Sequence, residues 1–237
     1  KRKMNHIISY YHFPVFCNRY FKMEDDNMEV MTTLQDHELS QFIHVPDIIK
    51  SRKATPQDLS AIYKVACSVG TKSKESYAGF LMDDYKSRPK YYQKFFLERI
   101  FELDYFYVAE SNVGILGFLM AYTKEQWLKY NPDWIDDIMW RPDFSMEKTA
   151  DFVIIDKTAI MANLTGKGIG STLYKTLLKD LKEKQIEHIF AETLIDPTPN
   201  FASLAFRKKQ KYSLAGARYE NYMDTLYTDL IYYKPVN

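Results

Sequence analysis

Residues 152–194 hold the feature that most restricts the fold, a strand-like run, a glycine-rich turn, an amphipathic stretch and a second strand-like run. The runs at 152–161 and 188–194 have the apolar, partly β-branched composition of buried strands. The stretch between them places leucines and isoleucine on one helical face and lysines on the other: Ile169, Leu173, Leu177, Leu178 and Leu181 against Lys175, Lys179, Lys182 and Lys184. This order predicts a right-handed crossover that sets two parallel strands side by side.

The turn between the first strand and the helix predicts a phosphate site. Its sequence, Thr165-Gly166-Lys167-Gly168-Ile169-Gly170-Ser171, coincides with the expected helix start. The first N–H groups of a helix lack intrahelical partners and face the positive end of its dipole, so they favour an anion. Glycines permit positive φ angles and close approach of the ligand, and Lys167 and Ser171 add a cation and a hydroxyl. A tight turn that merely packs the helix closely is the alternative.

The turn does not match the two best-known nucleotide motifs. A P-loop needs a Lys after its last glycine, and a dinucleotide fingerprint needs a third glycine where Ser171 stands. The histidines form no H-x-x-x-H pair, and only Cys17 and Cys67 occur, so no metal site and no disulfide framework is expected. A nucleotide-binding or metal-dependent enzyme is therefore the weakest of the function classes.

The remaining patterns predict a mixed α/β domain of residues 48–237 preceded by an aromatic-rich arm of residues 1–47. Apolar periodicity, turn residues and caps give the following elements: a strand near 48–52, a helix entered through Thr55-Pro56, an aromatic helical region at 74–103, a hairpin of 105–110 and 114–122, a helix at 200–210 and a last strand at 225–233. An insertion at about 127–146 holds all three tryptophans.

Composition bears on the binding partners and the cellular compartment to be expected. The 237 residues include 32 basic and 31 acidic side chains, and this near-neutral balance predicts neither nucleic-acid nor membrane affinity. No apolar stretch approaches the length of a spanning helix, and the Lys-led N-terminus lacks a secretory pattern. A cytoplasmic protein, monomeric or homodimeric, is the expectation.

Three segments in order resemble the GNAT superfamily of N-acetyltransferases. Residues 165–170 match both glycines of the family's Arg/Gln-x-x-Gly-x-Gly/Ala loop, with Thr165 in place of the usual Arg or Gln. Residues 49–59 resemble the family's opening strand and helix, and residues 200–206 resemble its late motif. The resemblance covers about residues 48–236.

This resemblance implies a central twisted mixed sheet whose parallel fourth and fifth strands splay apart to admit coenzyme A, with helices flanking the sheet. It implies acetyl-CoA as the cofactor, and it places the following residues at the cofactor: Ile160, Met161 and Ala162 on the fourth strand, Thr165, Gly166, Lys167, Gly168, Ile169, Gly170 and Ser171 in the loop, and Asn200, Ser203 and Phe206 in the late motif. The backbone edge of the fourth strand would pair with the amides of the cofactor.

Acetyl transfer to an amine needs an unprotonated nucleophile, and a Lys-like amine is protonated at pH 7. The candidates for a general base are Glu192 on the fifth strand and Asp156 on the fourth, and Glu192 is favoured. Both stay open because a bulge of unknown register would change which side chain points between the strands. An N–H near Ile160 would meet the charge that develops on the thioester oxygen. Arg207 stands where many family members have a Tyr that protonates the thiolate, so either Tyr212 or water would do this.

The leading expectation is an acetyl-CoA-dependent N-acetyltransferase that acts on a small-molecule or protein amine. The acceptor site would lie between the aromatic region 74–103 and the tryptophan insertion, where Asp133, Asp136 and Asp137 would attract a cation or simply face solvent. The alternative is a non-catalytic coenzyme A or acyl-CoA sensor, which the replacement of the usual Tyr by Arg207 favours.

Overall fold

The computed structural model describes residues 48–70 and 74–236, so the arm predicted over residues 1–47 lies outside the described part of the chain. The strands in the described residues are β1 (Lys50–Lys53), β2 (Tyr105–Ser111), β3 (Gly114–Thr123), β4 (Met139–Trp140), β5 (Val153–Ile160), β6 (His188–Asp196), β7 (Ser213–Tyr222) and β8 (Thr225–Pro235). The helices are α1 (Leu59–Val69), α2 (Pro89–Glu102), α3 (Lys124–Tyr130), α4 (Ile169–Glu183) and α5 (Phe201–Lys209), and short 3-10 turns cover Pro56–Asp58, Met146–Thr149 and Ala162–Leu164.

The strands form one mixed sheet in the order β1-β2-β3-β5-β6-β8-β7-β4. Only the central pair, β5 and β6, is parallel among the described strand pairs, and α4 is the crossover that connects them. The crossover and the mixed sheet predicted from the sequence are confirmed.

The two faces of the sheet carry two separate apolar cores. One face packs against α1, α2 and the tryptophan insertion, with Phe96, Phe118, Trp134 and Phe190 fully buried. The other packs against α4. Of the residues predicted on the apolar face of α4, Ile169, Leu173, Leu177 and Leu181 are buried, whereas Leu178 is half-buried at the edge of this core. Below, these are called the α1/α2 face and the α4 face.

One helix start differs from the sequence prediction, and one strand was not predicted. The helical region expected from residue 74 begins only at Pro89, and residues 74–88 are turns and irregular chain. Proline disfavours helical geometry in the residue before it and suits the first helical position, so Pro89 starts the helix. Residues 213–222 were not predicted as a strand. They form β7, joined to β8 by Met223 and Asp224 with φ angles of 49° and 59°, a left-handed turn without the glycine that usually marks one.

Candidate active site

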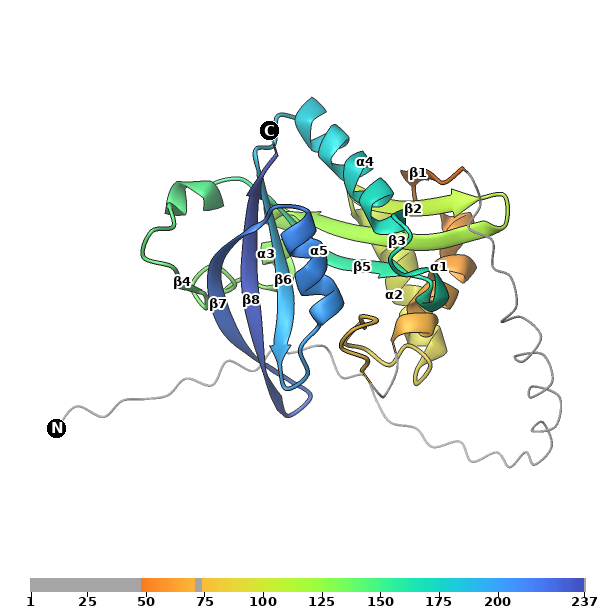
Figure 1. Cartoon of the computed structure of the whole chain (residues 1–237), viewed down its shortest axis with the longest axis horizontal. Coiled ribbons are helices and arrows are strands. Elements are labelled where there is room, and N and C mark those ends of the chain that lie inside the picture. Colours follow the sequence, from red (N-terminus) through yellow and green to blue (C-terminus); the bar gives the residue numbers. More distant parts are fainter. Residues whose placement is uncertain (1–47, 71–73, 237) are drawn as a thin grey trace. The chain divides into compact units, whose positions relative to one another are not determined.

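The central strands β5 and β6 part where the family resemblance predicts. They pair only through Val153–Ile189, Ile154–Phe190 and Ile155–Ala191. Beyond these three pairs β5 stays with β3 as far as Ile160, and β6 stays with β8 as far as Asp196. Figure 1 shows the two strands running in clearly different directions, with α4 and α5 beside them. The opening after Ile155 and Ala191 is called the fork.

Of the three residues predicted to contact the cofactor through their backbone, Ile160, Met161 and Ala162, only Ile160 has an N–H group that points into the fork. The N–H of Met161 donates to Leu116 O at 2.9 Å, on the side of β3. The N–H of Ala162 donates to Ser68 Oγ at 3.3 Å. Because successive N–H groups of a strand point to opposite sides, the N–H of Ile160 points away from β3, toward the fork. Ile160 is therefore the β5 residue best placed to meet a ligand with its backbone.

The glycine turn has the geometry of an anion cradle. Gly166 and Gly168 have φ angles of 84° and 87°, and a Cβ added at either would meet no atom within 4 Å. Residues 165–168 are exposed, Lys167 among them. The first hydrogen bond that closes α4 runs from Thr172 N–H to Gly168 O at 3.1 Å. The amides between them lie in the first turn, where a helix lacks internal acceptors. This open turn has the geometry of a helix N-terminus that can bind an anion.

The other loop residues flank this cradle. The Thr165 hydroxyl donates to Ala162 O at 3.1 Å, which holds the turn together and leaves the hydroxyl engaged. Ile169 is buried, whereas Gly170 and Ser171 are half-buried. A Cβ added at Gly170 would lie 3.6 Å from Phe206 Cε2, so α4 and α5 approach closely at this point.

The late motif forms the start of α5 and ties it to residues 74–80. Asn200 caps the helix by accepting from Ser203 N–H at 3.0 Å, and its side-chain amide donates to Phe80 O at 3.1 Å. The Ser203 hydroxyl lies 3.1 Å from that of Thr193 on β6. Both ends of the Asn200 side chain are therefore engaged in this structure, and its contact with the cofactor remains a prediction.

Glu192 is the first residue of β6 beyond the fork, and it points to the α1/α2 face. Its Oε1 accepts from Trp134 Nε1 at 2.7 Å. The same oxygen forms an ion pair with Arg218 Nε at 2.7 Å. Trp134 was expected only as part of the acceptor region; the structure makes it a buried positioning partner of the carboxylate.

Asp156 occupies the equivalent position on β5. The register between β3 and β5 shifts beside it, which is the bulge that alternation alone could not locate. Both its oxygens lie 3.0 Å from Lys157 Nζ. Burial opposes the charge of Lys157, but Asp156 and nearby acidic groups raise the pKa of the ammonium well above its ordinary value. Asp156 thus carries a permanent counter-ion.

Three charged residues near Glu192 were missed by the sequence analysis. Arg218 and Glu220 on β7 form an ion pair, and Asp229 on β8 lies opposite Arg218. Burial, and then the charge of Glu192, raises the pKa of Asp229 to about 7. Burial also raises the pKa of Glu220, and Glu192 adds to the effect. Charged residues at alternate positions of a strand that has an apolar face are the signal that could have revealed them.

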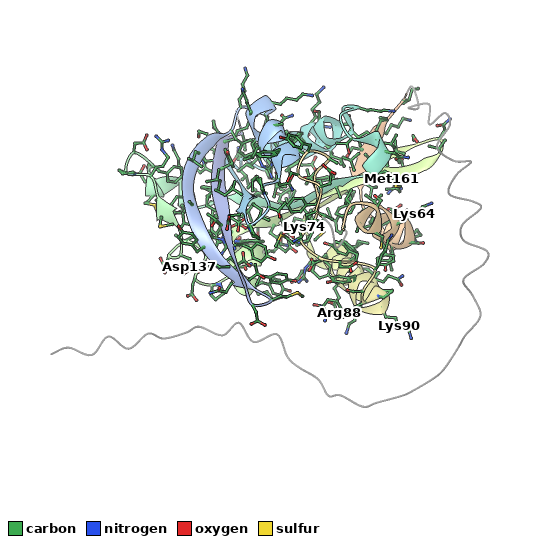
Figure 2. The ribbon with its side chains drawn as sticks, turned by 60° about the horizontal axis from the view of Figure 1, so that its bottom comes forward. Lys64, Lys74, Arg88, Lys90, Asp137 and Met161 are labelled. Carbon is green, nitrogen blue, oxygen red and sulfur yellow. The ribbon has the colours of Figure 1, made fainter. Side chains whose placement is uncertain are left out.

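Residues 74–88 cross from α1 toward the far side of the fork. Tyr222 on β7 donates to Asp83 Oδ1 at 2.6 Å, and Tyr92 on α2 donates to the same oxygen at 3.3 Å. The Lys74 ammonium lies 5.5 Å from the ring of Tyr227 on β8. Figure 2 shows Lys74 between α1 and the strands β7 and β8. The segment therefore links the two halves of the sheet on the α1/α2 face.

Tyr212 lies on the other side of the sheet from the two acids. It packs in the core of the α4 face, and its hydroxyl accepts from that of Tyr174 at 3.0 Å. Burial raises its pKa. Arg207 is 5% exposed, its Nε and Nη1 lack hydrogen-bond partners among the described residues, and its guanidinium lies 5.3 Å from the Tyr212 ring. The structure does not bring Tyr212 together with Glu192 or Asp156.

The other expected features are placed as follows. Asp133, Asp136 and Asp137 are exposed. In the described residues no group of three or more His, Cys, Asp or Glu side chains is arranged to hold a metal ion. None of the described helices is long and apolar enough to cross a membrane.

Residues 74–212 match the sequence profile of the Acetyltransferase (GNAT) family. The chain belongs to this family. The PaiA N-acetyltransferase from Thermoplasma acidophilum, solved with coenzyme A, is 20% identical with a TM-score of 0.52 over 79% of this chain and 99% of that one. Ard1 from Thermoplasma volcanium is 16% identical with a TM-score of 0.53 over 80% and 98%. A putative GNAT acetyltransferase from Desulfovibrio desulfuricans is 14% identical with a TM-score of 0.54 over 80% and 100%. No curated protein matches the sequence.

Membership in the family identifies the chain as an acetyl-CoA-dependent acetyltransferase and confirms the resemblance to the GNAT family, with the match covering residues 74–212. These three solved structures, all below 25% identity, confirm the fold. The structure gives the positions of the individual site residues around the fork, and their roles are proposed below.

Proposed function

We propose that this GNAT enzyme transfers the acetyl group of acetyl-CoA to a primary amine bound on the α1/α2 face of the fork, with Glu192 as general base. The parting of β5 and β6 after Ile155 and Ala191, beside an open glycine turn, is the observation that carries the proposal. In this arrangement the coenzyme approaches from the turn, residues 165–171, and the amine from the opposite face. The two reactants then meet between the parted strands.

Glu192 is preferred to Asp156 because of how each carboxylate is held. Lys157 Nζ lies 3.0 Å from both oxygens of Asp156, so neither oxygen is left open to an amine. Trp134 Nε1 donates to Oε1 of Glu192, and Arg218 Nε lies 2.7 Å from the same oxygen. The other oxygen of Glu192 makes no hydrogen bond within the described residues and is available to the amine or to one bridging water.

The proposed reaction accounts for each bond and proton. The amine nitrogen forms a bond to the acetyl carbon, the carbon–sulfur bond breaks with its electron pair on sulfur, and the proton released by nitrogen passes to Glu192. The Ile160 N–H is positioned to meet the charge that develops on the thioester oxygen. A thiol with a pKa near 8.5 leaves readily. Water is the proposed proton source for the thiolate, because Tyr212 lies on the α4 face.

A thiol-release assay tests the proposal. The purified chain is given acetyl-CoA with a panel of primary amines and peptides, and amine-dependent release of coenzyme A with formation of the N-acetyl product is expected. Binding of acetyl-CoA in calorimetry without turnover on any acceptor would instead favour a coenzyme A sensor, the alternative that Arg207 at the usual Tyr position supports. Absence of acetyl-CoA binding would contradict both.

The wider setting stays a prediction. We propose a cytoplasmic enzyme whose acyltransferase domain covers residues 48–237 after an arm of residues 1–47, acting as a monomer or homodimer on a small-molecule or protein amine without nucleic-acid or membrane partners. The near-neutral charge of the chain supports the last point. Gel filtration and localisation of a tagged chain test these statements.

A further inference from the structure

Asp229 is a buried carboxylate without a partner. Only 8% of the residue is exposed, yet among the described residues no hydrogen bond or ion pair reaches its side chain. Its cross-strand neighbour Arg218 is engaged elsewhere, with Glu192 at 2.7 Å and with Glu220. A buried carboxylate either takes up a proton or is paired with a cation, so an ionised Asp229 would be stabilised by a cation bound beside it.

The surroundings of Asp229 carry an excess of negative charge. Glu192 and Glu220 are both paired with the guanidinium of Arg218, and Asp229 lies opposite Arg218 across β7 and β8 as a third acid. The raised pKa of Asp229, about 7, comes from its burial and then from the neighbouring charge of Glu192, with Arg218 opposing and Glu220 adding. A bound cation would relieve both burial and repulsion. The described carboxylates do not form a metal-binding group, which leaves an organic ammonium group as the fitting cation.

The position of Asp229 relative to Glu192 gives the spacing. Glu192 lies opposite Ile231 on β8, and Asp229 lies opposite Leu194, two residues further along β6. Glu192 and Asp229 are therefore diagonal neighbours on one face of an antiparallel pair, about 7–8 Å apart. A short alkyl chain spans this separation.

We propose that the acceptor is a short diamine-like compound, whose reacting amine lies at Glu192 while a second ammonium group is held by Asp229 and Glu220. This inference rests on the proposed function and deepens it, because it assigns a substrate class to the same site. Glu192 removes the proton of the reacting amine, and Asp229 fixes the other end by charge. A monoamine of the same length gains nothing from Asp229.

Steady-state kinetics with 1,4-diaminobutane and n-butylamine tests the inference. The full chain should show a kcat/KM for the diamine about tenfold or more above that for the monoamine. Asp229→Asn should raise the KM for the diamine about tenfold or more, so that the ratio of kcat/KM for the diamine to that for n-butylamine falls toward one. Asp224→Asn, the same change at an exposed position of the β7–β8 turn, is the matched control and should change neither.

Equal values for the two amines, or an Asp229→Asn effect of the same size on both, would overturn the inference while leaving amine acetylation in place. If no amine is acetylated at all, the proposed function fails instead. Calorimetry of 1,4-diaminobutane binding to the wild type and to Asp229→Asn then decides the inference without turnover. Tighter binding to the wild type supports it, and equal or undetectable binding contradicts it. Thermal unfolding of both variants checks that each is folded.

Discussion

The two sides of the fork are built in opposite ways. The coenzyme side is one continuous stretch, residues 160–171, that offers backbone amides and two left-handed glycines. The acceptor side is made of buried side chains from β6, β7 and β8, together with the segment 74–88. Binding by backbone groups depends on amides that are free of other hydrogen bonds and not covered by side chains. Binding by side chains depends on the balance of their charges. The two sides should therefore respond to different substitutions.

The largest effect on cofactor binding is expected from Gly168→Asp on the coenzyme side. The new carboxylate would stand where phosphate binds, so affinity for acetyl-CoA in calorimetry should fall about 100-fold or more. Gly114→Asp is the matched control, since Gly114 also has a positive φ, 116°, with open space around an added Cβ. Both variants should lose stability from backbone strain, about 1–3 kcal/mol. Retained affinity in Gly168→Asp would mean that the turn does not bind phosphate.

On the acceptor side the expected loss is in turnover. Glu192→Gln keeps an acceptor for Trp134 Nε1 and removes the base, so kcat should fall about 100- to 10,000-fold with unchanged acetyl-CoA affinity. Asp156→Asn, the corresponding change on the other arm of the fork, should cost less than about tenfold, because Asp156 is not the base. Stopped assays with both variants give the comparison. The reverse order of losses would assign the base to Asp156.

The smallest effect is a change in how stability depends on pH. Asp229 has a folded pKa of about 7 against an ordinary value of 3.8, so the folded protein holds its proton more tightly than the unfolded chain. Its contribution to stability is therefore lost as pH rises from about 4 to about 7, at up to about 1.4 kcal/mol per pH unit. Above pH 7 Asp229→Asn should unfold at higher denaturant than the wild type, and the difference should shrink toward pH 5.

Urea unfolding at pH 5, 6, 7 and 8 measures this difference. Asp224→Asn serves again as the control and should follow the wild type, because Asp224 is exposed. A gap between Asp229→Asn and the wild type that does not change with pH would show that the Asp229 carboxylate is paired in solution.

The geometry of the proposed coenzyme side was predictable from the sequence because its parts are adjacent. Strand, glycine turn and helix follow one another, and local geometry makes such a turn an anion site whatever surrounds it. The apolar face of α4 and the parallel pair β5–β6 follow from the same stretch. The exception is Met161, whose N–H donates to Leu116 in β3, a contact that no local pattern encodes.

The acceptor side could not be predicted because its parts meet only in the folded sheet. The bulge beside Asp156 sets the direction of that side chain, and bulges leave little trace in sequence. β7, which carries Arg218 and Glu220, was missed since Met223 and Asp224 turn the chain with positive φ without glycine. In the sequence Asp229 is one polar residue of a half-exposed strand. Its lack of a partner follows only from the structure, in which Arg218 pairs with Glu192.

Amide hydrogen exchange with and without coenzyme A tests the central claim most directly, that the fork and its glycine turn bind the cofactor. The account predicts that coenzyme A slows exchange in residues 160–171, with the acceptor-side strands β7 and β8 unchanged, because the ligand covers backbone amides only on the coenzyme side. Protection confined to other segments, with exchange at residues 160–171 unaltered while coenzyme A is bound, would contradict it.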